Sequence, residues 1–208
     1  MNFNIIILLS FFVLASSSLL AQNEEKMMDK EMEELPYTSI PDHAESFTAT
    51  GVAARMIDGL GFRYRWATEF LREEDLPYQP DSTARSCDET LDHILGLTEM
   101  IVNAVENQPN VRPSEEKSYT LAEKREHTLA NIKRASDILW AGDGDELSDY
   151  KIIFQRGDKV SEFPFWNLIN GPVSDALWHC GQIVSFRRAA GNPMPSGVSV
   201  FSGRVRGQ

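Results

Sequence analysis

The stretch SCDETLDHILGLTEMIVNAVEN, residues 86–107, decides the fold class of this chain. It opens with Ser86 and, three residues later, Glu89, which is the capping-box pattern of a helix start. In this pattern each of the two side chains accepts a hydrogen bond from the backbone N–H of the other residue. Apolar residues then cover most of the helical circumference and leave only a narrow polar strip. The stretch therefore predicts a long helix that is packed on several sides, as in a helical bundle.

Three further stretches carry comparable signals and complete a four-helix bundle. Residues 48–71 carry apolar side chains at three- and four-residue steps. Residues 120–142 begin with a second capping box, led by Thr120. Residues 172–191 begin with Pro172, which suits a first helical position because an N–H there would have no partner inside the helix. For the first of these helices we expect a buried stripe formed by Val52, Met56, Gly59, Phe62, Trp66 and Phe70.

The connection between the third and fourth helices is long and partly strand-like. Residues 151–155 and 159–163 flank the tripeptide Arg156-Gly157-Asp158, and together they predict a short β-hairpin. The tripeptide also matches an adhesion signal, but three residues in a turn match by chance so often that we interpret it as a turn. The expected fold class is all-α: a four-helix bundle with a long crossover, containing this hairpin, between helices three and four.

Composition divides the chain into four parts. Residues 1–21 carry no charged side chain and end in a stretch rich in small residues, the pattern of a secretory signal peptide. Residues 22–47 are polar and form a linker or arm, residues 48–191 form the bundle, and residues 192–208 form a C-terminal tail. We therefore expect an exported protein, periplasmic or secreted, with no stable membrane span once the signal is cleaved. The alternative is that the first segment is retained as an N-terminal anchor.

The charge balance limits the partners. Lys and Arg number 20 against 31 Asp and Glu, and the resulting net charge of -11 repels phosphate backbones, so we expect no nucleic-acid partner. A small-molecule substrate or a thiol remains a candidate partner, and a homodimer a candidate assembly. Cys87 and Cys180 fit no zinc-finger spacing. We treat both as small apolar residues, with a single disulfide as the alternative in an oxidising compartment.

The four histidines differ in their expected surroundings. His127 shares its side of the third helix with charged residues and is expected at the surface, and His43 lies in a polar segment before the first helix. His93 lies at the edge of the apolar arc of the second helix. Near it in the sequence are Asp92 and Glu89, the only carboxylates that we consider as additional catalytic groups.

On the fourth helix, Asp175 and His179 are four residues apart and therefore lie on one face, one turn from each other. Two interpretations of this pair stay open from spacing alone. The pair can be a simple hydrogen bond between a carboxylate and an imidazole, with His93 as a satisfied histidine at the edge of the core. Alternatively, a cation bound by both side chains and by His93 would offset the cost of burying the carboxylate.

Two motifs resemble a known family. The sequences TLDHIL (90–95) and DALWHCGQ (175–182) are similar to the motifs of the DinB-like (DinB/YfiT-like) metal-binding four-helix bundles, and the resemblance covers residues 48–193. His93 matches a histidine that this family carries on its second helix, and His179 matches the last of two histidines on its fourth. Asp175 stands where the family has the other histidine. The sequence RRAAGNP (187–193) also resembles a subset of the family.

The resemblance implies a site in which His93, Asp175 and His179 hold one divalent transition metal ion, with zinc as the first candidate and nickel or iron as alternatives. Three ligands leave coordination positions open, as in catalytic rather than closed structural sites. The implied function is that of an exported, metal-dependent thiol transferase or hydrolase, with Trp166 and Trp178 as candidates to line its pocket. The alternative is a non-enzymatic, metal-binding or stress-associated envelope protein whose ion stabilises the bundle or is stored.

Overall fold

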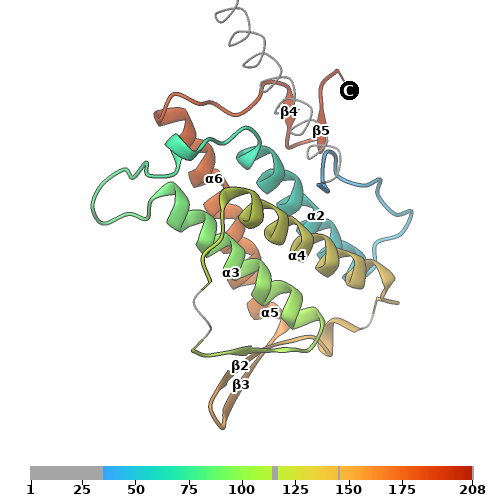
Figure 1. Ribbon diagram of the computed structural model, residues 1–208. Helices are drawn as coiled ribbons and strands as arrows, with labels where there is room; N and C mark the ends of the chain where they lie inside the picture. The colour runs from blue at the N-terminus through green and yellow to red at the C-terminus, as the bar shows by residue number, and fades with distance from the viewer. Residues whose placement is uncertain (1–34, 114–116, 145, 208) are drawn as a thin grey trace, which may run out of the picture. The chain divides into compact units, whose positions relative to one another are not determined.

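Four long helices pack against one another in the computed structural model, which describes residues 35–113, 117–144 and 146–207 (Figure 1). They are α2 (Ala49–Thr68), α3 (Cys87–Val105), α4 (Leu121–Ala141) and α6 (Ser174–Ala189). Helices α2 and α3 each contact both α4 and α6, so α2 and α3 occupy opposite corners of a four-helix bundle. The predicted fold class is confirmed. The expected signal peptide, residues 1–21, lies outside the described residues.

The two capping boxes place the starts of α3 and α4 as predicted. The Ser86 backbone N–H donates to Glu89 Oε2 at 2.8 Å, and the Glu89 N–H donates to Ser86 Oγ at 3.1 Å. Thr120 and Glu123 repeat the arrangement at 2.8 and 3.3 Å. Backbone donors that have no partner inside the helix are thereby satisfied, which fixes where each helix begins.

The predicted hairpin is confirmed and belongs to a small sheet. Strands β2 (Lys151–Arg156) and β3 (Lys159–Pro164) pair antiparallel, and β1 (Pro109–Val111) adds to β2 in parallel. Near the C-terminus, β4 (Val198–Ser199) and β5 (Arg204–Val205) form a second, very short hairpin. Two short 3-10 turns, Glu73–Asp75 and Glu146–Ser148, lie in the connections.

The expected buried stripe of α2 is partly wrong. Val52 and Met56 are 47% and 37% exposed, and Phe70 lies beyond the helix with 47% exposure, whereas Phe62 and Trp66 are buried as expected. Most of the helix is buried, because α4, α6 and parts of both chain ends cover it. A helix covered on several sides has no single apolar stripe, and spacing alone then selects an arbitrary one.

Segments assigned to the arm and the tail cover one face of α2. In residues 36–47 the side chains of Tyr37 and Ile40 are buried. Ile40 packs with Phe62 and Trp66, and this cluster is completed from the tail by Met194, Val198 and Val205. Gly61 permits the approach, because a Cβ at this position would stand 2.5 Å from the Tyr37 ring. The compact unit correspondingly spans Pro36–Gln208.

The fourth helix begins earlier than predicted. A short α-helical turn, α5 (Phe165–Leu168), continues through a π-helical turn, η3 (Ile169–Val173), directly into α6. Pro172 therefore lies inside a helical segment rather than at its first position. Proline lacks an N–H and clashes with the carbonyl four residues earlier, and the wider π turn accommodates both effects. The Ser174 hydroxyl donates to the Ile169 carbonyl at 2.6 Å, which satisfies an acceptor near this irregular turn.

A buried carboxylate joins α2 to α4. Asp58 on α2 is 1% exposed and accepts three hydrogen bonds: from Tyr37 Oη at 3.1 Å, from Ser136 Oγ at 2.5 Å and from Trp140 Nε1 at 3.0 Å. Burial, and then the charge of Asp58, raise the pKa of the Tyr37 hydroxyl, so it stays a donor at every physiological pH. A buried carboxylate is tolerated here because it accepts three hydrogen bonds, two from α4 and one from the segment before α2.

Replacing Asp58 with alanine should lower the free energy of unfolding by about 3 kcal/mol, because it leaves buried donors without an acceptor. Chemical denaturation followed by circular dichroism measures this change. The matched control is Asp137→Ala, one residue beyond Ser136 on α4, whose exposed carboxylate pairs with Lys133. We expect the control to change stability by about 0.5 kcal/mol or less. Equal effects of the two substitutions would contradict a supporting role for Asp58.

Candidate metal centre

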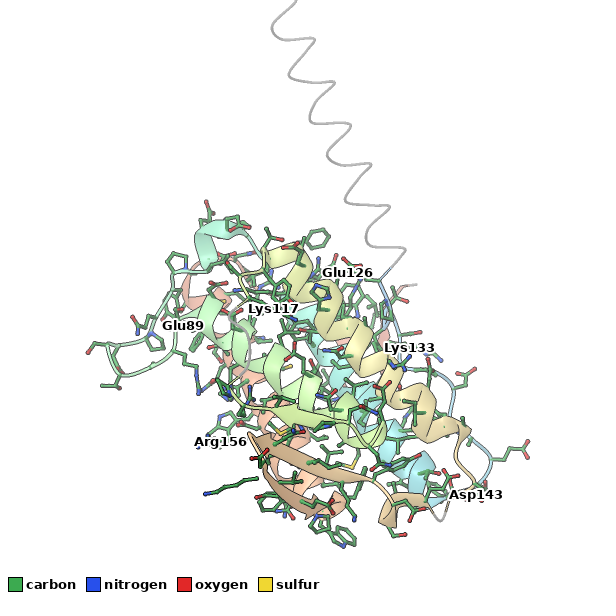
Figure 2. All side chains as sticks on the ribbon, turned by 60° about the horizontal axis from the view of Figure 1, so that its bottom comes forward. Glu89, Lys117, Glu126, Lys133, Asp143 and Arg156 are labelled. Carbon is green, nitrogen blue, oxygen red and sulfur yellow. The ribbon has the colours of Figure 1, made fainter. Side chains whose placement is uncertain are left out.

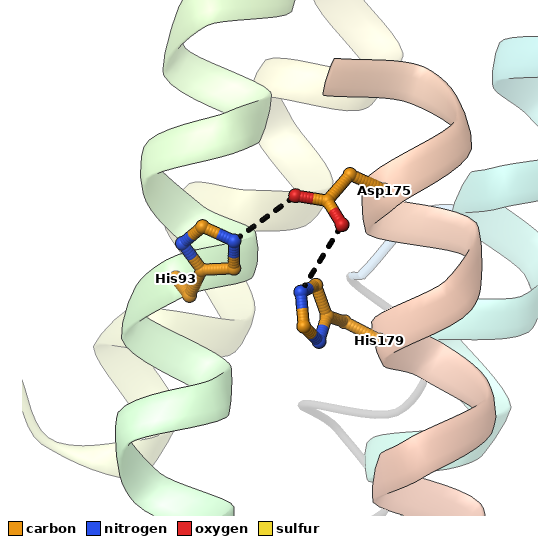
Figure 3. Close-up of side chains that lie close together, drawn as sticks. All are labelled: His93, Asp175 and His179. Atoms are coloured by element: carbon orange, nitrogen blue, oxygen red, sulfur yellow. Dashed lines mark hydrogen bonds and ion pairs between the residues drawn. The ribbon is translucent and has the colours of Figure 1, made fainter. Parts of the chain in front are cut away.

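The structure brings His93, Asp175 and His179 together between α3 and α6 (Figure 3). His93 Nε2 lies 3.1 Å from Asp175 Oδ2, and His179 Nε2 lies 3.3 Å from Asp175 Oδ1. The two imidazole rings meet edge to face, with centroids 4.7 Å apart. Each of the three residues offers one ligand atom, and these atoms lie within 4.8 Å of one another. The group could hold a metal ion.

Helix geometry explains how the three side chains meet. Asp175 and His179 are one turn apart on α6, so both face the same neighbour. That neighbour is α3, which packs against α6 and carries His93 in its second turn. The π turn η3 ends immediately before α6, and its extra residue rotates the following side chains about the helix axis. The direction in which Asp175 points from α6 therefore depends on this turn. Irregular turns of this kind often occur beside functional sites.

Two contacts of Asp175 have the length of a ligand–ligand separation. Ligand bonds of zinc to nitrogen or oxygen are about 2.0–2.2 Å long, so neighbouring ligand atoms in a tetrahedral shell stand about 3.4 Å apart. Asp175 meets His93 through Oδ2 at 3.1 Å and His179 through Oδ1 at 3.3 Å, distances that a hydrogen bond also has, and the ligand atoms of all three residues lie within 4.8 Å of one another. The Asp175 side chain is 39% exposed, that of His93 is 29% exposed and that of His179 is 10% exposed. One side of the group is therefore open to solvent.

The side chain of Gln182 holds the ring of His179. Nδ1 of His179 lies 2.6 Å from Oε1 of Gln182, one turn further along α6. The other ring nitrogen, Nε2, faces Asp175 Oδ1 at 3.3 Å. This nitrogen can meet the carboxylate either as a hydrogen-bond donor or as a second ligand atom to a shared cation. Because Gln182 follows His179 by three residues on one helix, the sequence could have identified it as this partner.

The additional carboxylates near His93 have structural roles. Asp92 accepts from Lys124 Nζ at 2.9 Å, and Asp88 accepts from the same ammonium at 2.6 Å. Glu89 is engaged in the capping box, and its backbone hydrogen bond to Ser86 holds the pKa of its carboxyl below the usual range. These contacts account for Asp92 and Glu89 without a catalytic role.

The remaining histidine and tryptophan candidates are exposed. His127 and His43 are exposed, as expected, and the ring of His127 meets that of Tyr119 at a tilt of 60°, with centroids 4.8 Å apart. Trp166 and Trp178 are 74% and 70% exposed, so both are surface residues.

The two cysteines are also unsuited to chemistry. Cys87 and Cys180 are buried and free, so the structure contains no disulfide between them. Burial raises the pKa of each thiol to about 12, which keeps both protonated at neutral pH. Although Cys180 follows His179 directly in the sequence, it therefore supplies no thiolate to the site. Both cysteines act as small core residues.

Comparison with known proteins supports the fold and extends no further. No protein-family model matches the chain, and no curated protein matches it. Among solved structures, the chain is similar to the crystal structure of a DinB-like protein, YjoA from Bacillus subtilis, with a TM-score of 0.50 and 14% sequence identity. The similarity covers 72% of this chain and 99% of that one. The resemblance inferred from the motifs is thus confirmed at the level of structure: the chain has the fold of the DinB-like four-helix bundles.

Proposed function

We propose that this chain is an exported DinB-like protein that holds one divalent transition metal ion with His93, Asp175 and His179 and uses it in thiol transfer or hydrolysis. The observation that carries the proposal is the convergence of these side chains from two helices, with the Asp175 carboxylate 3.1 and 3.3 Å from the two imidazoles. Two imidazoles and a carboxylate are competent ligands for zinc, nickel or iron, with zinc our first candidate.

The residues of the site would divide the work as follows. His93, Asp175 and His179 bind the ion from one side, and the solvent-exposed side leaves room for a small-molecule substrate or a thiol. A bound ion would supply a water or a thiol with a pKa lowered toward neutrality. Gln182 orients the His179 ring by accepting from Nδ1, so that Nε2 faces the ion.

The alternative is a non-enzymatic protein whose ion stabilises the bundle or is stored. One observation favours it: the ligands come from both α3 and α6, so an ion would join two helices. Removing the metal separates the two functions. The enzyme hypothesis expects turnover on a panel of thiol-transfer and hydrolysis substrates to vanish and to return when metal is added back. A large fall in melting temperature without any loss of turnover would favour the alternative.

Export is part of the proposal and rests on the uncharged segment of residues 1–21. We expect the mature protein, isolated from the producing cells, to begin at Gln22, directly after the small-residue stretch. N-terminal sequencing of the purified protein measures this. A soluble cytoplasmic product that still begins with Met1 would contradict export, and a membrane-bound product beginning with Met1 would favour the retained anchor.

The metal content of the protein, purified without a histidine tag, should be about one ion per chain by elemental analysis. His179→Ala should remove most of it, because two remaining ligands rarely hold a transition ion against water. The control is His127→Ala, which removes an exposed imidazole on α4 and should leave the content unchanged. Full metal content in the His179 variant would contradict the metal site and would leave the group as a carboxylate hydrogen-bonded between two imidazoles.

Gln182→Ala should weaken metal binding about 10- to 100-fold, because the ring of His179 loses the acceptor that sets its tautomer and orientation. Competition with a chelator of known affinity measures the dissociation constant. Gln108→Ala provides the matched control, since the side chain of that exposed glutamine donates to the Glu106 carbonyl beyond the end of α3, away from the metal ligands in the sequence. Unchanged affinity in the Gln182 variant would contradict the assigned role.

A further inference from the structure

The three-stranded sheet forms a surface cavity whose lining residues do not include the metal ligands. A cavity of about 480 Å³ opens on one face of β2 and β3, and the residues that line it include Arg112, Phe154, Arg156, Lys159, Ser161 and Phe163. The hairpin formed by these strands projects beyond the end of the helices (Figure 1). Arg156 lies at its tip, where Figure 2 labels it. A cavity of this size is large enough for a small organic molecule.

The strand register aligns three cations in one row. Arg156 on β2 lies directly opposite Lys159 on β3, and side chains at paired positions share a face of the sheet. On the other side, β1 runs parallel to β2 with Asn110 opposite Phe154, so Arg112, two residues on, comes level with Arg156. The Arg112 N–H donates to the Gln155 carbonyl at 2.8 Å, which continues the pairing to this point.

The turn of the hairpin fixes the pairing of Arg156 with Lys159. Only Gly157 and Asp158 separate the two paired cations, and Gly157 has a φ of +57°, which matches the first central position of a type II′ turn. A two-residue turn of this type fixes the register of the strands. Arg156 and Lys159 are therefore held side by side by the backbone.

Like charges that face each other across a sheet destabilise it, so Arg156 and Lys159, held side by side, favour a counter-charge. Within residues 35–113, 117–144 and 146–207 neither of these two side chains forms an ion pair. The hairpin has two acids: Asp158 lies in the turn without an ion pair to either cation, and Glu162 pairs with Lys151 at 2.8 Å on the opposite face. An oxyanion could therefore bind between the side chains of Arg156 and Lys159 on the cavity face.

Next to the cations lies an aromatic surface. Phe154 and Phe163 meet edge to face with ring centroids 6.0 Å apart, and Phe163 is 41% exposed. Rings in this arrangement offer an edge and a face on which a planar ligand can pack. One face of the hairpin therefore changes from aromatic at its base to cationic at its tip.

We propose that this face is a second binding site, separate from the metal centre, for a small aromatic anion. The planar part of the ligand packs on Phe154 and Phe163, and its phosphate, sulfonate or carboxylate group binds between Arg156 and Lys159, with Arg112 at the side. Guanidinium and ammonium groups form their strongest hydrogen bonds with such oxyanions. The two phenylalanine rings bind the aromatic part of the ligand, so tight binding requires both the anionic and the aromatic part.

Titration of the full-length protein with 1-naphthyl phosphate, followed by calorimetry, tests the proposal. We expect saturable binding that weakens at least about tenfold in the double variant Arg156→Gln/Lys159→Gln, because two charge-assisted contacts are lost. Lys151→Gln is the matched control, since it removes a cation from the opposite face of the same hairpin. We expect its affinity to equal that of the unaltered protein.

Two further probes, used on the unaltered protein, test the two halves of the ligand. Inorganic phosphate alone and 1-naphthol alone should each bind at least about tenfold more weakly than 1-naphthyl phosphate. Phosphate binding as tightly as the ester would reduce the site to a nonspecific cationic patch and overturn the proposal. So would an absence of binding by the ester, or an equal loss of affinity in the Lys151 variant.

Discussion

The position of α6 depends on one buried cation, Arg187, which is 1% exposed near the end of that helix. Its guanidinium donates to the carbonyls of Ala67 at 2.9 Å and Glu69 at 2.8 Å, where α2 ends, and its Nε donates to the Asn192 carbonyl at 2.7 Å. The carbonyls of Ala67 and Glu69 have no partner within α2, and a positive charge at the C-terminal end of a helix is favourable. Arg187 thus fixes one end of α6 against α2, while Asp175 meets His93 of α3 at the other end. Residues 187–193 carry a motif that resembles a subset of the family. They include Arg187, which holds the helix that carries the candidate site.

Local signals in the sequence were sufficient for much of the fold. Ser86 and Thr120 mark the starts of α3 and α4 because a capping box is a short-range hydrogen-bond pattern that neighbouring residues specify by themselves. The start of the fourth helix was missed, because the rule that places proline at a first helical position does not consider a π turn around Pro172. The burial of Tyr37 and Ile40 was also unpredictable, since it depends on contacts with α2 and with the C-terminal tail, which are distant in the sequence. The expected boundaries of the arm and the tail stay predictions.

The candidate site was only partly accessible from the sequence. The spacing of Asp175 and His179 puts them on one helical face, but it does not say which helix faces them. His93 was a candidate from its place at the edge of the apolar arc of its helix, and the family resemblance then favoured it as the third ligand. The contact between His179 and Gln182 was accessible from their spacing, three residues apart on one helix, whereas the contacts of Asp175 with the two imidazoles at 3.1 and 3.3 Å required coordinates. The cationic row on the sheet was hidden for a different reason. Arg112 reaches it through a parallel pairing with β2, and the partner in such a pairing is distant in the sequence.

X-ray absorption spectroscopy of the metal-loaded protein tests the central claim most directly, because it reports the atoms that surround the ion. A site built from His93, Asp175 and His179 predicts a first shell of nitrogen and oxygen at about 2.0–2.2 Å, with the outer-shell scattering of two imidazole rings. In protein prepared without added thiols, sulfur at about 2.3 Å, or a first shell without imidazole scattering, would contradict the account. Either result would mean that the ion is bound elsewhere on the chain.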